Sequence, residues 1–217
     1  MSVVTRRPAS TPTPTSRRHA PSALRRARAF LLALAGAIGL TIAVASPAAA
    51  AVYDIDEGHV DVVHARLSGG SIVLEVKNDA VPWGDPDVPS GLLSPALTAI
   101  EVPNTPALGG YVLPESYSDA TTHGLAFAGF GTDSTLSGSV TFTLVSASYS
   151  GSGAGGFTVS QGGTPLFTPS APSVTYSGPV HEHVKWQFTA PGTYTLSFRA
   201  ASGGATSTTV PFTFVVG

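Results

Sequence analysis

The sequence predicts an all-β protein, folded as an antiparallel β-sandwich over residues 51–217. Short runs rich in Val, Thr, Phe, Tyr and Leu recur along this region, and clusters of Gly, Pro, Asn and Ser separate them. Several runs alternate apolar and polar residues, which is the two-residue period of a half-buried strand. No stretch after residue 51 shows a helical hydrophobic period, so we expect no helix there. Many short strands joined by regular turns are typical of an immunoglobulin-like sandwich.

The first half of this region opens with a predicted hairpin over residues 59–79, which turns at residues 68–70. Residues 83–114 are rich in Pro and Gly, and we expect long loops around short strands there. Residues 139–151 alternate cleanly, which predicts a strand whose apolar side chains share one face.

The second half repeats this pattern with shorter connections. A hairpin is predicted over residues 155–170, with its turn at 162–163, because Gly-Gly favours tight hairpin turns. Another hairpin is predicted over 184–203, turning at 190–192, and residues 208–216 read as a last strand.

The hairpin over 184–203 carries the predicted aromatic core. Val184, Trp186 and Phe188 fall at alternate positions and therefore share one face of their strand. We expect Trp186 and Tyr194 to be buried. Tyr194 follows a glycine turn and is also a candidate for a tyrosine corner that pins one end of the sandwich.

The first fifty residues have the pattern of a secretory signal peptide. Residues 1–28 contain seven arginines and no acid, residues 29–45 are apolar, and an A-x-A site follows at residues 48–50. We expect cleavage before Ala51, a secreted or cell-surface protein of residues 51–217, and no membrane span after cleavage. The alternative is an uncleaved membrane anchor.

Charge and cysteine content exclude several classes of partner and site. Residues 51–217 contain four Lys and Arg against thirteen Asp and Glu, a difference of −9. Such an acidic domain repels nucleic acid and anionic lipid and favours cations. The chain has no cysteine, so disulfides, thiol nucleophiles and thiolate metal sites are absent.

Two histidines near the end of the chain are the clearest candidates for a functional site. His181 and His183 are two residues apart, so in a strand their imidazoles project from the same face. Imidazole nitrogen suits zinc, copper and nickel. The alternative is that one ring is exposed and the other makes an ordinary hydrogen bond.

A second cluster with the same spacing lies near residue 51. Glu57, His59 and Asp61 would present carboxylate, imidazole and carboxylate on one strand face. We therefore predict a site for zinc or another divalent transition metal made by His59, His181 and His183, with Glu57 or Asp61 completing it. The alternative is a solvated edge strand whose charges block pairing with other sheets.

Two further histidines are weaker candidates. His64 has the opposite strand parity to His59 and Asp61, so we expect it to lie on the other face. His123 stands alone in its segment and is at most an additional ligand.

The sequence gives little support to catalysis. It contains no G-x-S-x-G elbow, no phosphate loop and no H-E-x-x-H pair. We therefore expect a binding module and no enzyme. Two alternatives remain: a structural or adhesive domain that binds protein or glycan through Trp83, Tyr111 and Tyr117, and a hydrolase whose site is scattered along the sequence.

Three motifs resemble one family of exported proteins. They are "DEGHVDVV" (56–63), "YVLPES" (111–116) and "HEHVKWQFTAPGTYTLSF" (181–198). In this order they are similar to actinobacterial surface-anchored proteins, the choice-of-anchor M domains and related anchored repeats. Lys185 stands where the family's motif usually has asparagine. The resemblance implies a cell-surface component, and some family members accompany metal-type ABC transporters.

Overall fold

A computed structural model describes residues 53–168 and 172–217. The predicted signal peptide over residues 1–50 and its cleavage before Ala51 lie outside the described residues. Within the described ranges most residues are in strands, so the prediction of an all-β sandwich is confirmed. The immunoglobulin-like class stays a prediction.

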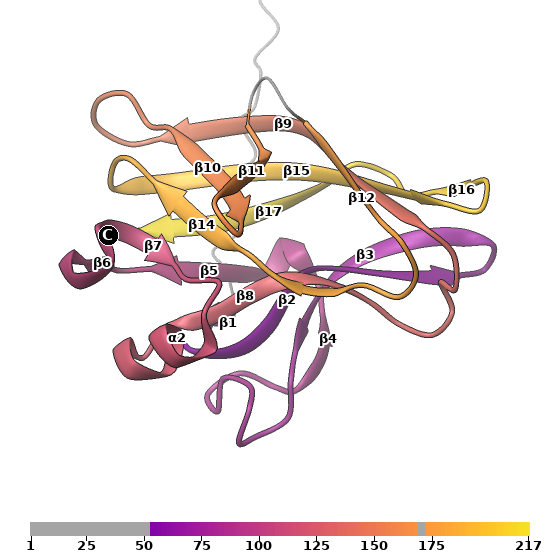
Figure 1. Cartoon of the computed structure of the whole chain (residues 1–217), viewed down its shortest axis with the longest axis horizontal. Helices are drawn as coiled ribbons and strands as arrows, with labels where there is room; N and C mark the ends of the chain where they lie inside the picture. The colour runs from indigo at the N-terminus through magenta and orange to yellow at the C-terminus, as the bar shows by residue number, and fades with distance from the viewer. Residues whose placement is uncertain (1–52, 169–171) are drawn as a thin grey trace, which may run out of the picture. The chain divides into compact units, whose positions relative to one another are not determined.

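The described strands form three sheets (Figure 1). The largest has the order β1-β5-β17-β15-β9-β12, with β16 beside β15. Its strands are β1 (Tyr53–Ile55), β5 (Thr98–Val102), β9 (Val140–Ser150), β12 (Ser173–Tyr176), β15 (Gly192–Ser202), β16 (Ala205–Thr206) and β17 (Val210–Val216).

The second sheet has the order β13-β8-β2-β3-β4 and holds four of the five predicted site residues, since Glu57 precedes β2. Its strands are β2 (Gly58–Ser68), β3 (Ser71–Asn78), β4 (Gly91–Leu93), β8 (Ala126–Thr132) and β13 (His181–His183). The third sheet has the order β11-β10-β14-β7-β6. Its strands are β6 (Asn104–Thr105), β7 (Gly110–Leu113), β10 (Phe157–Gln161), β11 (Thr164–Phe167) and β14 (Lys185–Phe188).

Two of the three sheets contain parallel pairs, so the prediction of an antiparallel sandwich is wrong for those sheets. Strand β5 pairs in parallel with both β1 and β17, and β2 pairs in parallel with β8. Figure 1 shows β9, β15 and β17 above β8, β2 and β3. In each parallel pair the two strands are separated along the chain by several other strands, which is the long connection that parallel pairing requires.

Two of the three predicted hairpins form. Strands β2 and β3 are joined at Gly69 and Gly70, and strands β10 and β11 at Gly162 and Gly163. All four glycines have positive φ, which two-residue hairpin turns require. The hairpin predicted over 184–203 is wrong, because β14 and β15 lie in different sheets and the chain crosses between them.

The expectation of no helix is also wrong, because a short α-helix, α2, spans Tyr117–His123. Its first turn is capped by Ser116, whose side chain accepts a hydrogen bond from the Asp119 N–H, and Gly124 ends it in the left-handed conformation. Seven residues are too few to show a helical period, but these two caps are the signal in the sequence. Two 3-10 helices span Pro95–Leu97 and Pro106–Leu108.

Among the described helices, none has the length and apolar character needed to cross a bilayer.

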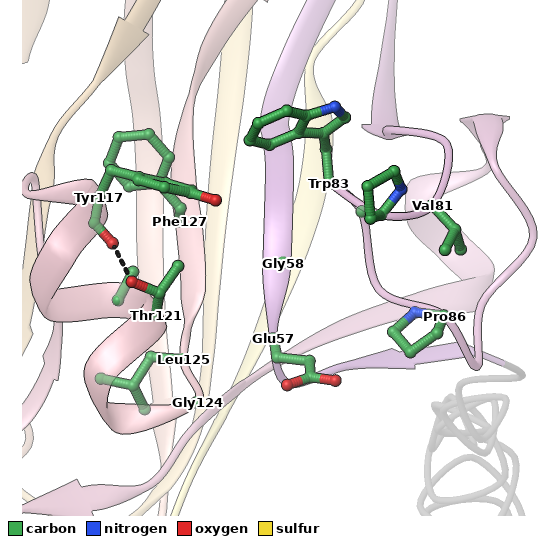
Figure 2. A pocket seen from close by; sticks show the side chains of 13 residues that line it. Glu57, Gly58, Val81, Trp83, Pro86, Tyr117, Thr121, Gly124, Leu125 and Phe127 are labelled. Atoms are coloured by element: carbon green, nitrogen blue, oxygen red, sulfur yellow. Dashed lines mark hydrogen bonds between the residues drawn. The ribbon is translucent and has the colours of Figure 1, made fainter.

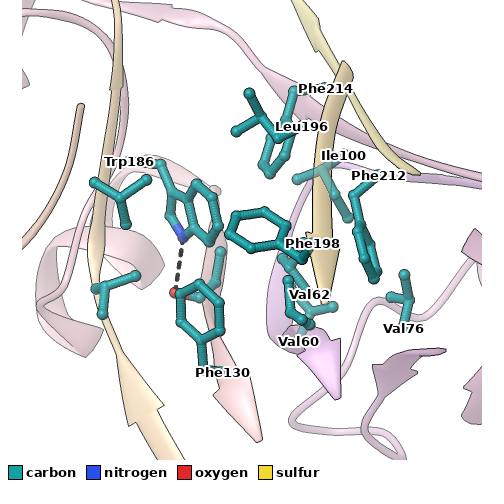
Figure 3. Close-up of a cluster of buried hydrophobic side chains, with 14 of the residues drawn as sticks. Val60, Val62, Val76, Ile100, Phe130, Trp186, Leu196, Phe198, Phe212 and Phe214 are labelled. Atoms are coloured by element: carbon teal, nitrogen blue, oxygen red, sulfur yellow. Dashed lines mark hydrogen bonds between the residues drawn. The ribbon is translucent and has the colours of Figure 1, made fainter. Parts of the chain in front are cut away.

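The core is one hydrophobic cluster to which all three sheets contribute (Figure 3). Trp186 of β14 is fully buried, as predicted, and its indole N–H donates to the Ala128 carbonyl at 3.3 Å. Its ring lies 4.9 Å from that of Phe214 and 5.5 Å from that of Phe130, measured between centroids. Such aromatic contacts join the sheets beyond what burial alone contributes.

Tyr194 is buried as predicted, and its hydroxyl donates to the Ala190 carbonyl at 3.0 Å. This bond to the backbone a few residues upstream is the contact expected of a tyrosine corner. It fixes the chain where it crosses from β14 to β15.

Replacing Trp186 with alanine should lower the free energy of unfolding by about 3–5 kcal/mol, because a large buried ring is replaced by a cavity. Chemical denaturation measures this loss. The matched control is Trp83→Ala, which removes a side chain that is 58% exposed and should change stability little. Equal stabilities of the two variants would contradict the assignment of Trp186 to the core.

Candidate metal centre

Strand β2 carries the first part of the centre on the face opposite the core. His59 and Asp61 lie on this outer face, while Val60 and Val62 are fully buried. A β-bulge follows Asp61, and the register with both neighbouring strands shifts there. The bulge adds one residue, so the strand's alternation is reversed beyond it.

The bulge overturns the prediction for His64. Val62 and Val63 both point into the core, and His64 therefore returns to the face of His59 and Asp61. Its Nδ1 lies 3.1 Å from Oδ2 of Asp61. A strict two-residue period cannot predict this position.

Strand β8 separates β2 from β13, and two of its glycines make room for the site. His181 pairs with Gly131 and His183 pairs with Gly129. A Cβ atom on Gly129 would lie 3.1 Å from Nδ1 of His183, and one on Gly131 would overlap the Asp61 carboxylate. Glycine here lets side chains from both neighbouring strands meet above β8.

Three imidazoles converge across β8. The Nε2 atom of His59 lies 3.1 Å from Nε2 of His181 and 2.8 Å from Nε2 of His183. One ligand nitrogen from each ring lies within 4.8 Å of the others, which makes these three residues a group able to hold a metal ion. The structure thus brings together all three histidines predicted for the site.

Hydrogen bonding alone cannot satisfy this arrangement. A neutral imidazole nitrogen is either a donor or an acceptor, with one proton or one in-plane lone pair. Nε2 of His59 faces two other Nε2 atoms and can make a good bond to only one. A cation placed between three unprotonated nitrogens would satisfy all of them together.

The Nδ1 atoms of two of the three rings lie near carboxylates, which favour a proton there. His59 Nδ1 lies 2.9 Å from Oδ2 of Asp79, an ion-pair distance without hydrogen-bond alignment. His181 Nδ1 lies 3.9 Å from Oδ1 of Asp61. His183 Nδ1 is buried and has no hydrogen-bond partner among the described residues. A proton held on Nδ1 leaves Nε2 free to bind a metal.

Burial keeps two of the rings neutral. Burial, together with the nearby rings of His59 and His181, lowers the pKa of His183 to about 4. The pKa of His59 is also lowered by burial, although Asp79 and Asp61 oppose the shift. Neutral imidazole is the form that binds a metal, so these rings are ready to do so at neutral pH.

Asp61 lies near Nδ1 of His181 and does not belong to the group of converging ligand atoms. Burial would raise its pKa, but the hydrogen bond from His64 and the charge of Lys77 outweigh burial and lower it. The ammonium of Lys77 lies 3.8 Å from Oδ2 of Asp61. Asp61 is therefore an ionised, almost fully buried carboxylate, and its Oδ1 has no hydrogen-bond partner.

The remaining candidates lie away from the three rings. Glu57 is exposed and lines a separate cleft with Trp83 and Tyr117. His123 is exposed at the end of α2. Neither belongs to the group of converging ligand atoms in the described residues.

Asp79 was not among the predicted site residues, and the loop after β3 positions it. Asn78 is buried, and its amide donates to the carbonyls of Asp85 and Val88 at 3.1 and 2.9 Å. Its side-chain oxygen accepts from the Asp85 N–H at 3.0 Å. These bonds hold the loop that begins with Asp79 close to β2. The available signal in the sequence was the Asn78-Asp79 pair, which directly follows the apolar alternation of this strand.

Phe127 is a second residue that the sequence analysis missed. Its ring stacks on His183, with centroids 3.6 Å apart and planes 8° apart. The stacking fixes the orientation of His183 and shields it from water. Phe127, Gly129 and Gly131 share one face of β8, and this aromatic-x-Gly-x-Gly pattern was the available signal.

The stability of the metal-free protein should depend on pH through His183. In the unfolded chain histidine titrates near a pKa of about 6.5, whereas the folded protein holds the pKa of His183 at about 4. Between these values the unfolded state binds more protons, so this contribution to stability is complete above about 6.5 and is lost as the pH falls toward about 4. With a chelator present, the denaturant concentration at the unfolding midpoint should decrease as the pH is lowered through this window.

His183→Gln removes the titrating group and should make the fall shallower. His123→Gln is the control, because it removes an exposed histidine outside the cluster and should keep the parent's slope. Identical slopes for the two variants would show that His183 is not held neutral by the fold.

Comparison of the chain with protein-family models, with curated proteins and with solved structures finds no match. The resemblance to surface-anchored proteins therefore rests on the three quoted motifs.

Proposed function

We propose that this protein is an exported binding module that holds one divalent transition metal ion outside the membrane, with zinc as the first candidate. His59, His181 and His183 are the proposed ligands, each through Nε2. The observation that carries the proposal is the convergence of three Nε2 atoms, with carboxylates beside the Nδ1 atoms of His59 and His181.

The distances between the nitrogens fit such an ion. Tetrahedral Zn–N bonds of about 2.0–2.1 Å place ligand nitrogens about 3.4 Å apart. The two shortest separations here are 2.8 and 3.1 Å. Small rotations of the rings would therefore create the ligand positions without moving the strands.

Access to the site favours reversible binding over a closed structural role. His181 is 59% exposed at its side chain, and β13 is a three-residue strand at the edge of its sheet. Three protein ligands leave a fourth position for water or for a ligand from a partner. An ion can enter and leave on this side, which suits uptake or transfer more than permanent stabilisation or catalysis.

The surroundings support the same proposal. Asp61 and Asp79 contribute negative charge close to the rings, and the acidic balance of residues 51–217 attracts cations. The likeness to proteins that accompany metal-type ABC transporters fits a role as a surface component that supplies or buffers metal. Secretion rests on the signal-peptide pattern in residues 1–50.

One observation favours a second function, adhesion through exposed aromatic rings. Trp83 and Tyr117 are both exposed, as a protein-binding or glycan-binding surface would require. Tyr111, the third aromatic candidate, packs partly against the core. This function does not need the histidine cluster.

Zinc should raise the melting temperature of residues 51–217 at pH about 7.5. An ion that binds only the folded state stabilises it by about 2.7 kcal/mol when free ion exceeds the dissociation constant a hundredfold. The double variant His181→Ala/His183→Ala should abolish this shift, and His59→Ala should strongly reduce it. Thermal unfolding with and without zinc measures these effects.

His123→Ala is the matched control, and it should keep the parent's response to zinc. Calcium should not replace zinc, because imidazole is a poor ligand for it. If zinc, copper and nickel all leave the parent's melting curve unchanged, the proposed site does not exist.

Asp79→Asn should weaken zinc binding about 10–100-fold, because the carboxylate beside His59 Nδ1 no longer favours the metal-binding form of the ring. Calorimetric titration measures the affinity. Glu75→Gln is the control, because it also removes a carboxylate beside a strand of this sheet, where Glu75 pairs with Arg66. Equal affinities of the two variants would show that Asp79 does not support a metal ligand.

A further inference from the structure

Phe127, whose ring stacks on His183, also lines a separate cleft (Figure 2). Its volume is about 290 Å³, at the small end of the range for ligand pockets. Trp83 of the β3–β4 loop lies on one side, and Tyr117 of α2 and Phe127 of β8 lie on the other. The Glu57 carboxylate lies at one end of the cleft.

Aromatic rings dominate the walls. The ring centroids of Trp83 and Tyr117 are 6.2 Å apart, and those of Tyr117 and Phe127 are 5.5 Å apart. The side chains of Trp83 and Tyr117 are 58% and 46% exposed. Two large aromatic side chains exposed in one cleft form an apolar surface of the kind that often marks a binding site.

The charge at this cleft is negative. Within the described part of the chain, the Glu57 carboxylate makes no hydrogen bond and no ion pair. Asp56 precedes it, and burial together with the charges of Asp85 and Asp87 raises the Asp56 pKa. Glu57 is the one acidic residue among the described residues that line the cleft, and these aspartates add negative charge nearby, so a cation is the favoured ligand charge.

The walls are held in place by the fold. The His59 N–H donates to the Trp83 carbonyl at 2.6 Å, which ties the loop to β2. On the opposite wall the Thr121 hydroxyl donates to the Tyr117 carbonyl at 3.0 Å inside α2. The cleft is therefore formed before any ligand arrives, which lowers the entropic cost of binding.

We propose that this cleft binds an organic ammonium group, either of a small molecule such as choline or of a lysine side chain. The faces of Trp83, Tyr117 and Phe127 attract a cation through their ring quadrupoles, and Glu57 supplies the opposite charge. An anion would be repelled by Glu57. An extended saccharide would need more space and more free polar groups than this small, largely apolar cleft offers.

Fluorescence titration tests the proposal directly. The chain has two tryptophans; Trp186 is fully buried and Trp83 is exposed, so a ligand in the cleft changes the emission of Trp83. The probes are choline, N-acetyl-lysine amide and the neutral carbon isostere of choline, at constant ionic strength with a chelator present. We expect saturable binding of at least one ammonium probe and about tenfold weaker binding of the neutral isostere.

Two variants distinguish the contribution of the Glu57 charge to binding from that of the aromatic wall. Glu57→Gln should weaken binding of the ammonium probe about tenfold, and Trp83→Leu should abolish it when binding is followed by calorimetry. Asp119→Asn, which removes an exposed acid of α2 outside the cleft lining, should bind as the parent does. Preference for choline would indicate a small-molecule source, and preference for the lysine probe would indicate a peptide.

Three outcomes would overturn the proposal. The first is equal binding of choline and its neutral isostere, which would leave only an apolar cleft. The second is binding of a saccharide and of no ammonium probe. The third is no saturable change with any probe. Because the titration is done without metal, its result is independent of the zinc experiments.

Discussion

The candidate metal centre depends on the absence of side chains at two positions of β8. His59 projects from β2 and His183 from β13, and the two strands are separated by the full width of β8 between them. A Cβ atom on Gly129 would lie 2.5 Å from the Glu182 carbonyl oxygen and 3.1 Å from Nδ1 of His183, so glycine leaves room there for β13 and its ring. Gly131 does the same for the Asp61 carboxylate. A methyl group at Gly129 would press on the backbone of β13, and one at Gly131 would displace the Asp61 carboxylate.

Burying this polar cluster is costly, and the surrounding charges offset the cost. Asp61 is almost fully buried, and the Lys77 ammonium and the His64 ring stabilise its charge. Lys77 also pairs with Asp79 at 2.7 Å, so one cation serves both carboxylates beside the histidines. Burial lowers the pKa values of His59 and His183, so these two rings avoid charge. The cluster is therefore electrostatically balanced before an ion binds, although its Nε2 atoms are not fully satisfied.

Sequence reasoning succeeded where the two-residue period holds and failed where the backbone departs from it. Strand alternation placed His181 with His183, and Trp186 on the core face, correctly. It misplaced His64, because the bulge in β2 inserts a residue that composition does not reveal. The crossing after β14 was read as a hairpin turn, since Pro and Gly mark either kind of connection. The meeting of β2 with β13 and the approach of Asp79 depend on long-range pairing, which a single sequence does not display.

Residues 181–188 form strands in two different sheets within one short segment of the chain. Its first three residues pair with β8 and present two imidazoles to the outer face, and after Val184 the chain pairs with β10 and β7 and buries Trp186. One inserted or deleted residue between His183 and Trp186 would turn one set of side chains to the wrong face. The segment should therefore accept substitutions at exposed positions such as Gln187 but no change of length. In a collection of natural variants, its spacing should stay fixed while the neighbouring loops vary.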